Sequence, residues 1–291
     1  MKIISLLLLL LPISSFAQAI YFEPIEAEMA KSGIYRSIFE DSTGHIWFGT
    51  MNEGVIRKVG DVFEKLIPPD TINLKGAASI FESKDGSIYF TGRGVFKIKD
   101  GIISKIDDAG VKSSVVFNIT EDENGIWFLG NRGAAYLTDQ GIWSGYFSGS
   151  GLTDLVAHDG EFDDEGNHWI ATRRGGLNII DNEGEWSNPF PNANCRKILK
   201  SSNGDMWIGS NKGILHYESG TRILTVYRED ELLIPEFEAE DGSIWFSSES
   251  SGLWRFIDES FQQMWTQPVY TAQNLSTGEI LIGATTGLDT L

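Results

Sequence analysis

The chain has 291 residues, of which 41% are hydrophobic and 12% aromatic, and this composition is that of a folded globular protein rather than a disordered one. With 41 acidic against 23 basic residues its formal net charge is −18, and we expect no nucleic-acid partner because such a surface repels a polyanion. Its single cysteine, Cys195, excludes an intramolecular disulfide.

Residues 1–19 have the pattern of a secretory signal peptide. Lys2 precedes an apolar stretch from Ile3 to Leu11, and small residues around Ala17 form a cleavage site. The apolar stretch is shorter than the roughly 20 residues that a membrane span needs, and no later stretch approaches that length. We therefore expect a mature domain over 20–291 that is periplasmic or secreted and has no membrane span.

One short pattern then recurs seven times along the chain. Each copy has an acidic or polar turn with a glycine, then an aromatic residue, then a second glycine before an apolar run. The aromatic positions are separated by 42, 38, 42, 38, 38 and 36 residues, and they are Trp47, Tyr89, Trp127, Trp169, Trp207, Trp245 and, as a substitute, Leu281. A period near 40 residues with strand-like content is typical of a β-propeller that has one four-stranded blade per repeat.

Each repeat predicts four strands. In the first repeat they cover 34–40, 45–50, 55–59 and 62–66, with turns at 41–44 and 60–61. Asp, Asn, Ser and Gly dominate the turns because they bond their own backbone or tolerate positive φ. The recurring aromatic ring is expected to fill the core between neighbouring blades rather than to stack on a ligand.

The two ends of the chain predict how the ring closes. The seventh repeat stops after a short third strand at 288–291, so its fourth strand is missing. Residues 20–24 precede the first innermost strand and resemble a fourth strand. We therefore predict an all-β, seven-bladed β-propeller of four-stranded antiparallel blades. We expect an N-terminal strand to complete the last blade and to close the ring, so that no strand edge is left unpaired between the first and last blades.

The repeats resemble the two-component regulator propeller repeat, most clearly in FEDSTGHIWFGTMNEGV (39–55) and EFDDEGNHWIATRRGGL (161–177). That family's pattern runs acidic-Asp-x-x-Gly-x-x-Trp-Ile/Phe-Gly-Thr and then Gly-Gly-Leu, and the resemblance covers 20–291. It implies a periplasmic sensor module of a hybrid histidine kinase, responding to oligosaccharides. The chain contains no second propeller and no kinase sequence. A stand-alone binder, a truncated receptor and a module that works through a sensor kinase or a neighbouring domain all stay open.

Basic and aromatic residues recur at two equivalent places in the repeats. Cations occupy the loops between second and third strands at Arg93, Arg132, Arg173, Arg174 and Lys212. Eight residues before the turn glycine, at the entry to the innermost strand, stand Arg36, His158, Arg196 and Tyr270.

These residues converge on one rim of the channel if the blades are as predicted. Arginine suits carboxylate or sulfate, and tyrosine can stack on a sugar, so we expect a small-molecule or acidic oligosaccharide ligand at the channel mouth. The alternative, in which these cations only pair with neighbouring carboxylates, stays open.

An enzyme is a further alternative, since some seven-bladed propellers are metal-dependent lyases or lactonases, and streptogramin lyases carry a similar Gly-x-x-Trp-Phe repeat. Such activities need histidine and carboxylates together at the channel. Only His158, with Asp159 or Glu161, could face it. We expect no catalytic residue, no metal and no cofactor. A protein–protein interaction scaffold is the remaining alternative.

Overall fold

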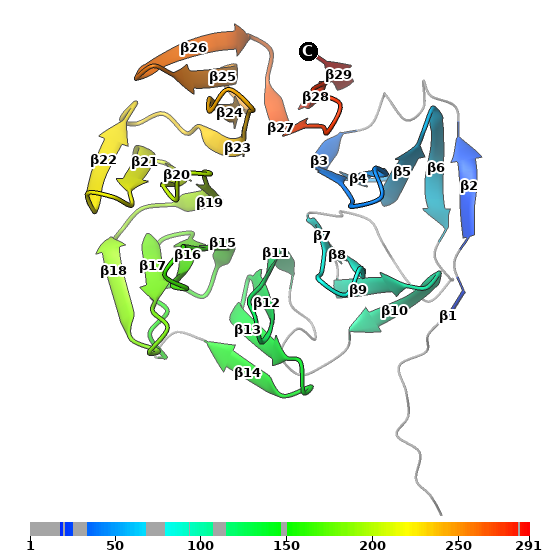
Figure 1. The fold of residues 1–291 in the computed structure, drawn as a ribbon, viewed down its shortest axis with the longest axis horizontal. Helices are drawn as coiled ribbons and strands as arrows, with labels where there is room; N and C mark the ends of the chain where they lie inside the picture. The colour runs from blue at the N-terminus through cyan, green and yellow to red at the C-terminus, as the bar shows by residue number, and fades with distance from the viewer. Residues whose placement is uncertain are drawn as a thin grey trace, which may run out of the picture.

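The computed structural model describes residues 18–19, 21–25, 34–67, 79–92, 94–106, 115–146, 150–284 and 286–291. Every regular element in these ranges is a β-strand, and the strands form seven sheets around a central axis (Figure 1). The predicted seven-bladed β-propeller is therefore confirmed. No helix in the described ranges is long and apolar enough to cross a membrane. The predicted signal peptide lies outside the described residues, except for 18–19.

The strands of the first four blades follow the repeats in chain order. Blade 1 contains β3 (Tyr35–Glu40), β4 (Ile46–Thr50), β5 (Val55–Val59) and β6 (Val62–Ile67). Blade 2 contains β7 (Ile80–Glu82), β8 (Ile88–Gly92), β9 (Gly94–Lys99) and β10 (Ile102–Ile106). Blade 3 contains β11 (Val116–Glu121), β12 (Gly125–Gly130), β13 (Gly133–Thr138) and β14 (Trp143–Tyr146). Blade 4 contains β15 (Ala157–Phe162), β16 (His168–Thr172), β17 (Leu177–Ile180) and β18 (Trp186–Phe190).

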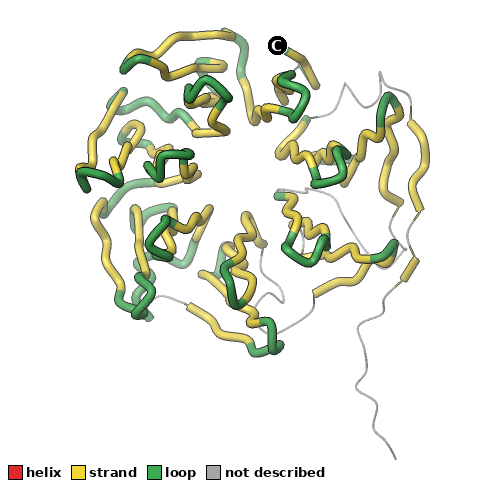
Figure 2. The backbone as a smooth tube through the Cα atoms, viewed as in Figure 1, coloured by secondary structure: helices red, strands yellow, loops and turns green. Residues whose placement is uncertain are grey.

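The last three blades continue the ring. Blade 5 contains β19 (Cys195–Lys200), β20 (Met206–Ser210), β21 (Gly213–Glu218) and β22 (Ile223–Tyr227). Blade 6 contains β23 (Ile234–Glu238), β24 (Ile244–Ser248), β25 (Gly252–Ile257) and β26 (Ser260–Trp265). Blade 7 contains β27 (Val269–Asn274), β28 (Ile280–Ala284) and β29 (Gly287–Thr290). In each blade the first strand lies nearest the axis and the later strands lie farther out (Figure 2).

The turn aspartate and the repeat tryptophan are directly bonded. Asp41 accepts the backbone N–H groups of Thr43 and His45 through Oδ1, and the Trp47 indole N–H through Oδ2 at 2.6 Å. Asp122 and Asp163 hold Trp127 and Trp169 in the same way. Gly44 follows at φ +80°, a conformation that favours glycine. The repeat therefore fixes the tight turn and the large core ring with one carboxylate.

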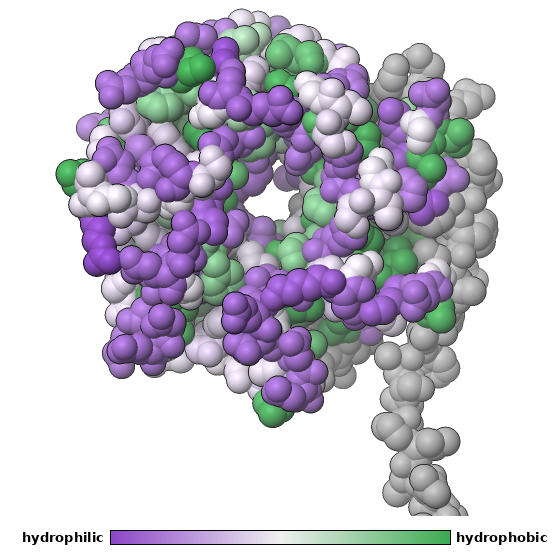
Figure 3. Space-filling model, in the orientation of Figure 1, coloured by the Kyte–Doolittle hydropathy of each residue, from purple (hydrophilic) through white to green (hydrophobic). Residues whose placement is uncertain are grey.

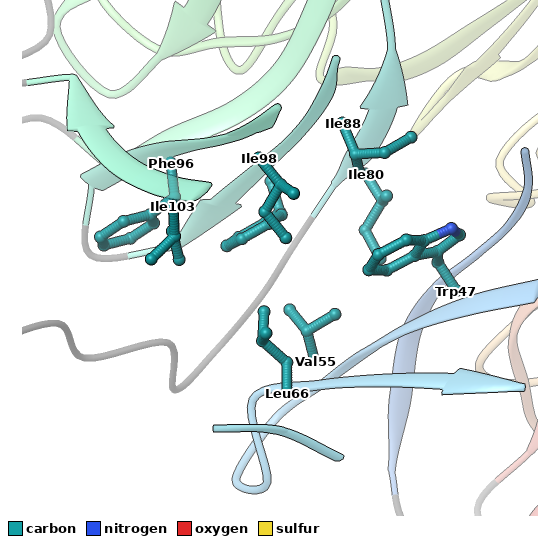
Figure 4. Packing of buried hydrophobic residues seen from close by; sticks show 9 residues of the cluster. Trp47, Val55, Leu66, Ile80, Ile88, Phe96, Ile98 and Ile103 are labelled. Carbon is teal, nitrogen blue, oxygen red and sulfur yellow. The ribbon is translucent and has the colours of Figure 1, made fainter. Parts of the chain in front are cut away.

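Hydrophobic clusters bridge every pair of neighbouring blades, so both faces of each sheet are buried. Fully burying a side chain of this size contributes about 1.5–3 kcal/mol. Figure 4 shows the cluster between blades 1 and 2, formed by Trp47, Val55 and Leu66 on one side and Ile80, Ile88, Phe96, Ile98 and Ile103 on the other. The five repeat tryptophans are 3–6% exposed, which agrees with their predicted core role.

The N-terminal strand pairs with the first blade, not with the last. β2 (Tyr21–Ile25) runs antiparallel to β6, with Tyr21 opposite Ile67 and Ile25 opposite Phe63. β1 (Gln18–Ala19) pairs with β10 of blade 2. Among the described residues blade 7 has three strands, so the prediction that 20–24 complete it is wrong.

The physical reason is that an extended pattern predicts a strand without specifying its partner. β6 lies about forty residues along the chain from β2, whereas β29 lies at the other end of it. The shorter loop loses less conformational entropy when it closes.

Packing and a polar contact close the ring between blades 7 and 1. Tyr35 and Phe48 of blade 1 share a buried cluster with Leu275 and Leu281 of blade 7. In addition, the Ser276 backbone N–H and hydroxyl donate to the two Glu40 carboxylate oxygens at 2.7 and 2.6 Å. The same contact joins blades 1 and 2 through Ser42–Glu82, and blades 5 and 6 through Ser202–Glu238. We call this contact the Ser–Glu clasp.

Candidate functional site

The predicted entry residues lie at β-bulges. In six blades the pairing of the innermost strand with its neighbour shifts by one residue. In five of them the extra residue stands eight before the turn glycine, whereas in blade 6 it is Glu236. A bulge takes a side chain out of the normal alternation and re-aims it. The residues at the five equivalent positions are Arg36, Phe117, His158, Arg196 and Tyr270.

A cavity of about 280 Å³ lies at the axis, where these bulges meet. Figure 3 shows a central opening bordered by hydrophilic residues on the face in view. Innermost strands, or the residues leading into them, line the cavity from blades 1, 2, 3, 4, 5 and 7, with the side chains Arg36, Ser37, Ile38, Ser79, Ile80, Phe117, Asn118, His158, Asp159, Arg196, Lys197, Thr271, Ala272 and Gln273.

The structure brings together part of the predicted site. Arg36, His158 and Arg196 line the cavity, and Tyr270 precedes Thr271, which lines it. The loop cations lie at the same end of the blades, where their loops bond to the entries of the innermost strands, as in Arg173 N to Val156 O at 2.9 Å. These exposed loop residues are Arg132, Arg173, Arg174 and Lys212. Arg93 lies outside the described residues.

The arginines fall into two groups by their partners. Four of the described arginines form ion pairs with carboxylates, namely Arg57, Arg222, Arg228 and Arg255. The guanidinium groups of the other five described arginines have no hydrogen bond or ion pair to any described residue. These five are predicted rim residues, namely Arg36, Arg132, Arg173, Arg174 and Arg196. The alternative in which the rim cations serve to pair with neighbouring carboxylates therefore does not describe these side chains.

His158 presents a hydrogen-bond acceptor at the cavity. Its Nδ1 lies 2.9 Å from the Cys195 carbonyl oxygen, which only accepts, so Nδ1 carries the hydrogen and Nε2 is the acceptor in the neutral ring. Burial lowers the pKa of His158, and the positive charges of Arg196 and Arg173 act in the same direction. The imidazole is thus neutral at pH 7, and Nε2 can accept a ligand hydroxyl.

Charge inside the cavity is mostly positive. Lys197 Nζ is 2.5 Å from Glu236 Oε2, so that cation already has a partner. Asp159 is 5% exposed and accepts the Ile198 backbone N–H at 2.7 Å. Burial raises the pKa of Asp159 to about 7, so its carboxyl is only partly ionised at neutral pH. Arg36 and Arg196 therefore face the cavity without a full counter-charge.

Two small polar residues of the cavity were missed by sequence reasoning. Ser37 Oγ and Asn118 Oδ1 are buried and have no hydrogen-bond partner in the structure. Buried polar atoms without partners are uncommon, and a ligand or ordered water satisfies them. Phe117, whose ring meets His158 edge-on with 5.6 Å between centroids, was missed although it has the same offset from its turn glycine.

Replacing Asp159 by Asn is expected to stabilise the protein in a pH-dependent manner. The folded-state pKa of Asp159, about 7, lies above its unfolded value near 4. The contribution of Asp159 to the free energy of unfolding is therefore complete below pH 4 and is lost as the pH rises to 7. The stability gained in the variant should grow from near zero at pH 4 to about 2–4 kcal/mol above pH 7. Urea unfolding across this pH range measures it. A gain that does not change with pH contradicts the buried, partly protonated carboxyl.

Other acidic and reactive side chains have ordinary surroundings. The Asp122 and Asp163 carboxylates, in the first turns of blades 3 and 4, accept backbone and indole N–H groups. Burial raises the pKa of the Cys195 thiol to about 12. In the described part of the chain, no group of three or more His, Cys, Asp or Glu is arranged to hold a metal ion.

Many known structures have a similar fold, and three of them follow. The extracellular domain of a protein assigned as a hybrid two component system from B. thetaiotaomicron has a TM-score of 0.78 at 20% identity, over 94% of this chain and 41% of that chain. The extracellular domain of a protein assigned as a one component system from the same organism has a TM-score of 0.77 at 13% identity, over 96% and 40%. A streptogramin B lyase has a TM-score of 0.70 at 18% identity, over 94% and 97%.

The chain thus spans about two fifths of the length of the two extracellular domains that it matches. No curated protein is significantly similar to it in sequence. Residues 30–52 match the family model described as two component regulator propeller. The resemblance to the two component regulator propeller repeat is therefore confirmed, in sequence at residues 30–52 and in fold for the seven-bladed ring.

Proposed function

We propose that this propeller is an extracytoplasmic ligand-binding module of a sensor, and that an acidic oligosaccharide binds at the channel mouth. The observation that carries the proposal is a difference between two groups of arginines. The rim guanidinium groups have no partner among the described residues, while all other described arginines have carboxylate partners. Unpaired guanidinium groups around a cavity favour a carboxylate or sulfate ligand, because they can form paired, charge-assisted hydrogen bonds to it.

The neutral parts of the cavity favour a sugar. His158 Nε2 and Asn118 Oδ1 can accept hydrogen bonds from hydroxyl groups, Ser37 Oγ can accept or donate them, and Phe117 offers an apolar surface. The cavity of about 280 Å³ has room for one sugar unit, with further units over the loops of the rim.

Two independent observations support the proposed location. The N-terminal sequence has the pattern of a signal peptide, and two of the similar structures are extracellular domains of proteins assigned to two-component or one-component systems. We infer a periplasmic or secreted module that passes ligand occupancy to a sensor kinase or a neighbouring domain.

Calorimetric titration of the mature protein tests this function. The probes are trigalacturonate and a sulfated disaccharide, with the methyl ester of trigalacturonate as a neutral control of the same shape. At least one acidic probe is expected to bind. The affinity of the ester should be lower than that of trigalacturonate by about tenfold or more. Absence of binding for both acidic probes, or equal affinity for acid and ester, overturns the proposal.

A lyase reaction is the second candidate, because His158 Nε2 is unprotonated at neutral pH and faces the cavity beside Asp159. A base that removes a proton next to a carboxylate or ester needs that protonation state. Incubation with trigalacturonate tests it by absorbance of the unsaturated product near 235 nm, roughly where such products absorb. A signal that His158→Gln removes supports a lyase, and no signal excludes this reaction on this substrate.

A further inference from the structure

The face opposite the channel mouth carries the first-to-second and third-to-fourth turns of the blades, and two grooves lie there on either side of the blade 4 turn. The groove between blades 3 and 4 has a volume of about 750 Å³, and the groove between blades 4 and 5 has about 660 Å³. Both are lined by Asp163, Asp164 and Asp181. The two grooves therefore form one tract across three blades, long enough for an extended chain segment.

The blade 3–4 groove is strongly negative. Lys84 is its one basic lining residue among those described, against seven acidic ones. Three of these carboxylates, Asp122, Asp163 and Asp181, accept hydrogen bonds within their own turns. Glu121 accepts the Lys84 backbone N–H, and Asp164 pairs with Lys200 of blade 5. The carboxylates of Glu123 and Glu183 are exposed and have no partner among the described residues. The seven acidic residues are Glu121, Asp122, Glu123, Asp163, Asp164, Asp181 and Glu183.

The Ser–Glu clasp is absent between blades 3 and 4, which lie on either side of this groove. The equivalent positions hold Glu123 and Phe162, which cannot form the clasp. The Phe162 ring instead stacks on the His168 imidazole, with 4.2 Å between centroids and 12° between planes. Tyr146 stacks on Trp127 at 5.0 Å on the blade 3 side. The floor of the groove is therefore aromatic.

A buried polar atom at the floor has no partner. His168 lines the groove, is 1% exposed, and its Nδ1 has no hydrogen bond within the structure. Its Nε2 lies 3.3 Å from Thr120 Oγ1. Burial lowers the pKa of His168 to about 3 in spite of the nearby Asp122 charge, so the ring stays neutral. If Nε2 donates to Thr120, Nδ1 is left as an acceptor for an N–H group.

We propose that this tract docks a basic, extended segment of a partner protein, with an arginine or lysine side chain seated in the blade 3–4 groove beside Glu123 and Glu183 and over the aromatic floor. Carboxylates combined with aromatic faces are the groups that bind a guanidinium or ammonium with an apolar stem. The second groove also combines aromatic and acidic residues, with 4.9 Å between the ring centroids of Trp169 and Tyr217, but its Glu165 is already paired with Arg222. The interaction is independent of the ligand proposed at the channel mouth.

Fluorescence anisotropy with a labelled hexa-arginine peptide tests the docking surface in about 0.15 M salt. The double variant Glu123→Gln/Glu183→Gln should weaken binding about tenfold. The matched control Glu240→Gln/Glu259→Gln removes two exposed charges from the corresponding turns of blade 6 on the same face, and it should weaken binding less than about twofold.

Three results overturn the proposal. They are no binding of the peptide to the wild-type protein, equal weakening in the two double variants, and competition by spermine at the same molar concentration as the unlabelled peptide. Equal weakening means a diffuse effect of the net charge, and competition by spermine means a site for small polyamines rather than for a protein segment. Hexa-glutamine serves as the uncharged peptide control.

Discussion

Replacing Arg36 and Arg196 together by Gln is expected to weaken binding of an acidic saccharide by about 100-fold or more while the melting temperature stays within a degree or so. Both guanidinium groups line the channel cavity and have no hydrogen bond or ion pair to any residue that the structure describes, so their removal breaks no such contact there. Each charge-assisted hydrogen bond to a ligand is worth about 1.5–3 kcal/mol. Calorimetric titration with trigalacturonate or the sulfated disaccharide, together with thermal unfolding, measures both effects.

A charge-matched control separates local binding from the field of the whole protein. Arg222→Gln with Lys99→Gln also removes two positive charges, but both residues pair with carboxylates away from the rim, Glu165 and Asp85. The affinity of this control variant for the acidic saccharide should fall less than about twofold. Reversal of Arg132 and Arg173 to Glu, in the loops around the mouth, should abolish binding as well. Equal loss in the control variant contradicts a rim that acts through direct contacts.

Replacing Tyr35 by Ala is expected to destabilise the protein by about 3–5 kcal/mol. The ring is fully buried at the closure between blades 1 and 7, where its Cβ lies 3.0 Å from the position of a Cβ on Gly283. Its hydroxyl is buried without a partner, and burial raises its pKa to about 12. Tyr35→Phe should therefore be neutral or stabilising by up to about 1 kcal/mol. Urea unfolding measures the two variants.

A second truncation tests whether Tyr35 acts at the closure in particular. Phe128→Ala removes a ring of similar size from the interface of blades 2 and 3, and its stability loss should be comparable. Hydrogen exchange should show β27 to β29 losing protection first in Tyr35→Ala but not in Phe128→Ala. Loss of protection in the same blade for both variants contradicts closure of the ring at blades 7 and 1.

The repeat predicted the blades well because one set of physical requirements recurs in each of them. In every blade the residue at the aromatic position packs against the next blade, and in blades 1, 3 and 4 the turn aspartate also holds both the backbone and the indole N–H, so a fixed spacing appears in the sequence. The partner of the N-terminal strand could not be predicted in this way. The alternation in 21–25 makes an extended segment, but β6 and β29 both offer an open edge, and chain connectivity decides between them.

For the candidate site, offset from the turn glycine identified Arg36, His158 and Arg196 because each stands at the same bulge. Ser37 and Asn118 could not be found, since a serine or asparagine in a strand has no pattern that shows it will be buried without a partner. Whether a rim arginine is paired depends on contacts between blades about 40 residues apart. Sequence spacing within one repeat does not contain that information.

The most direct test of the binding proposal is a crystal structure of the mature protein with trigalacturonate or the sulfated disaccharide. We predict density for one sugar unit in the axial cavity, its anionic group within hydrogen-bond distance of Arg36 and Arg196, and a hydroxyl on His158 Nε2. Density for the probe only in the grooves of the opposite face, or arginines 36 and 196 paired with protein carboxylates in an empty cavity, contradicts it.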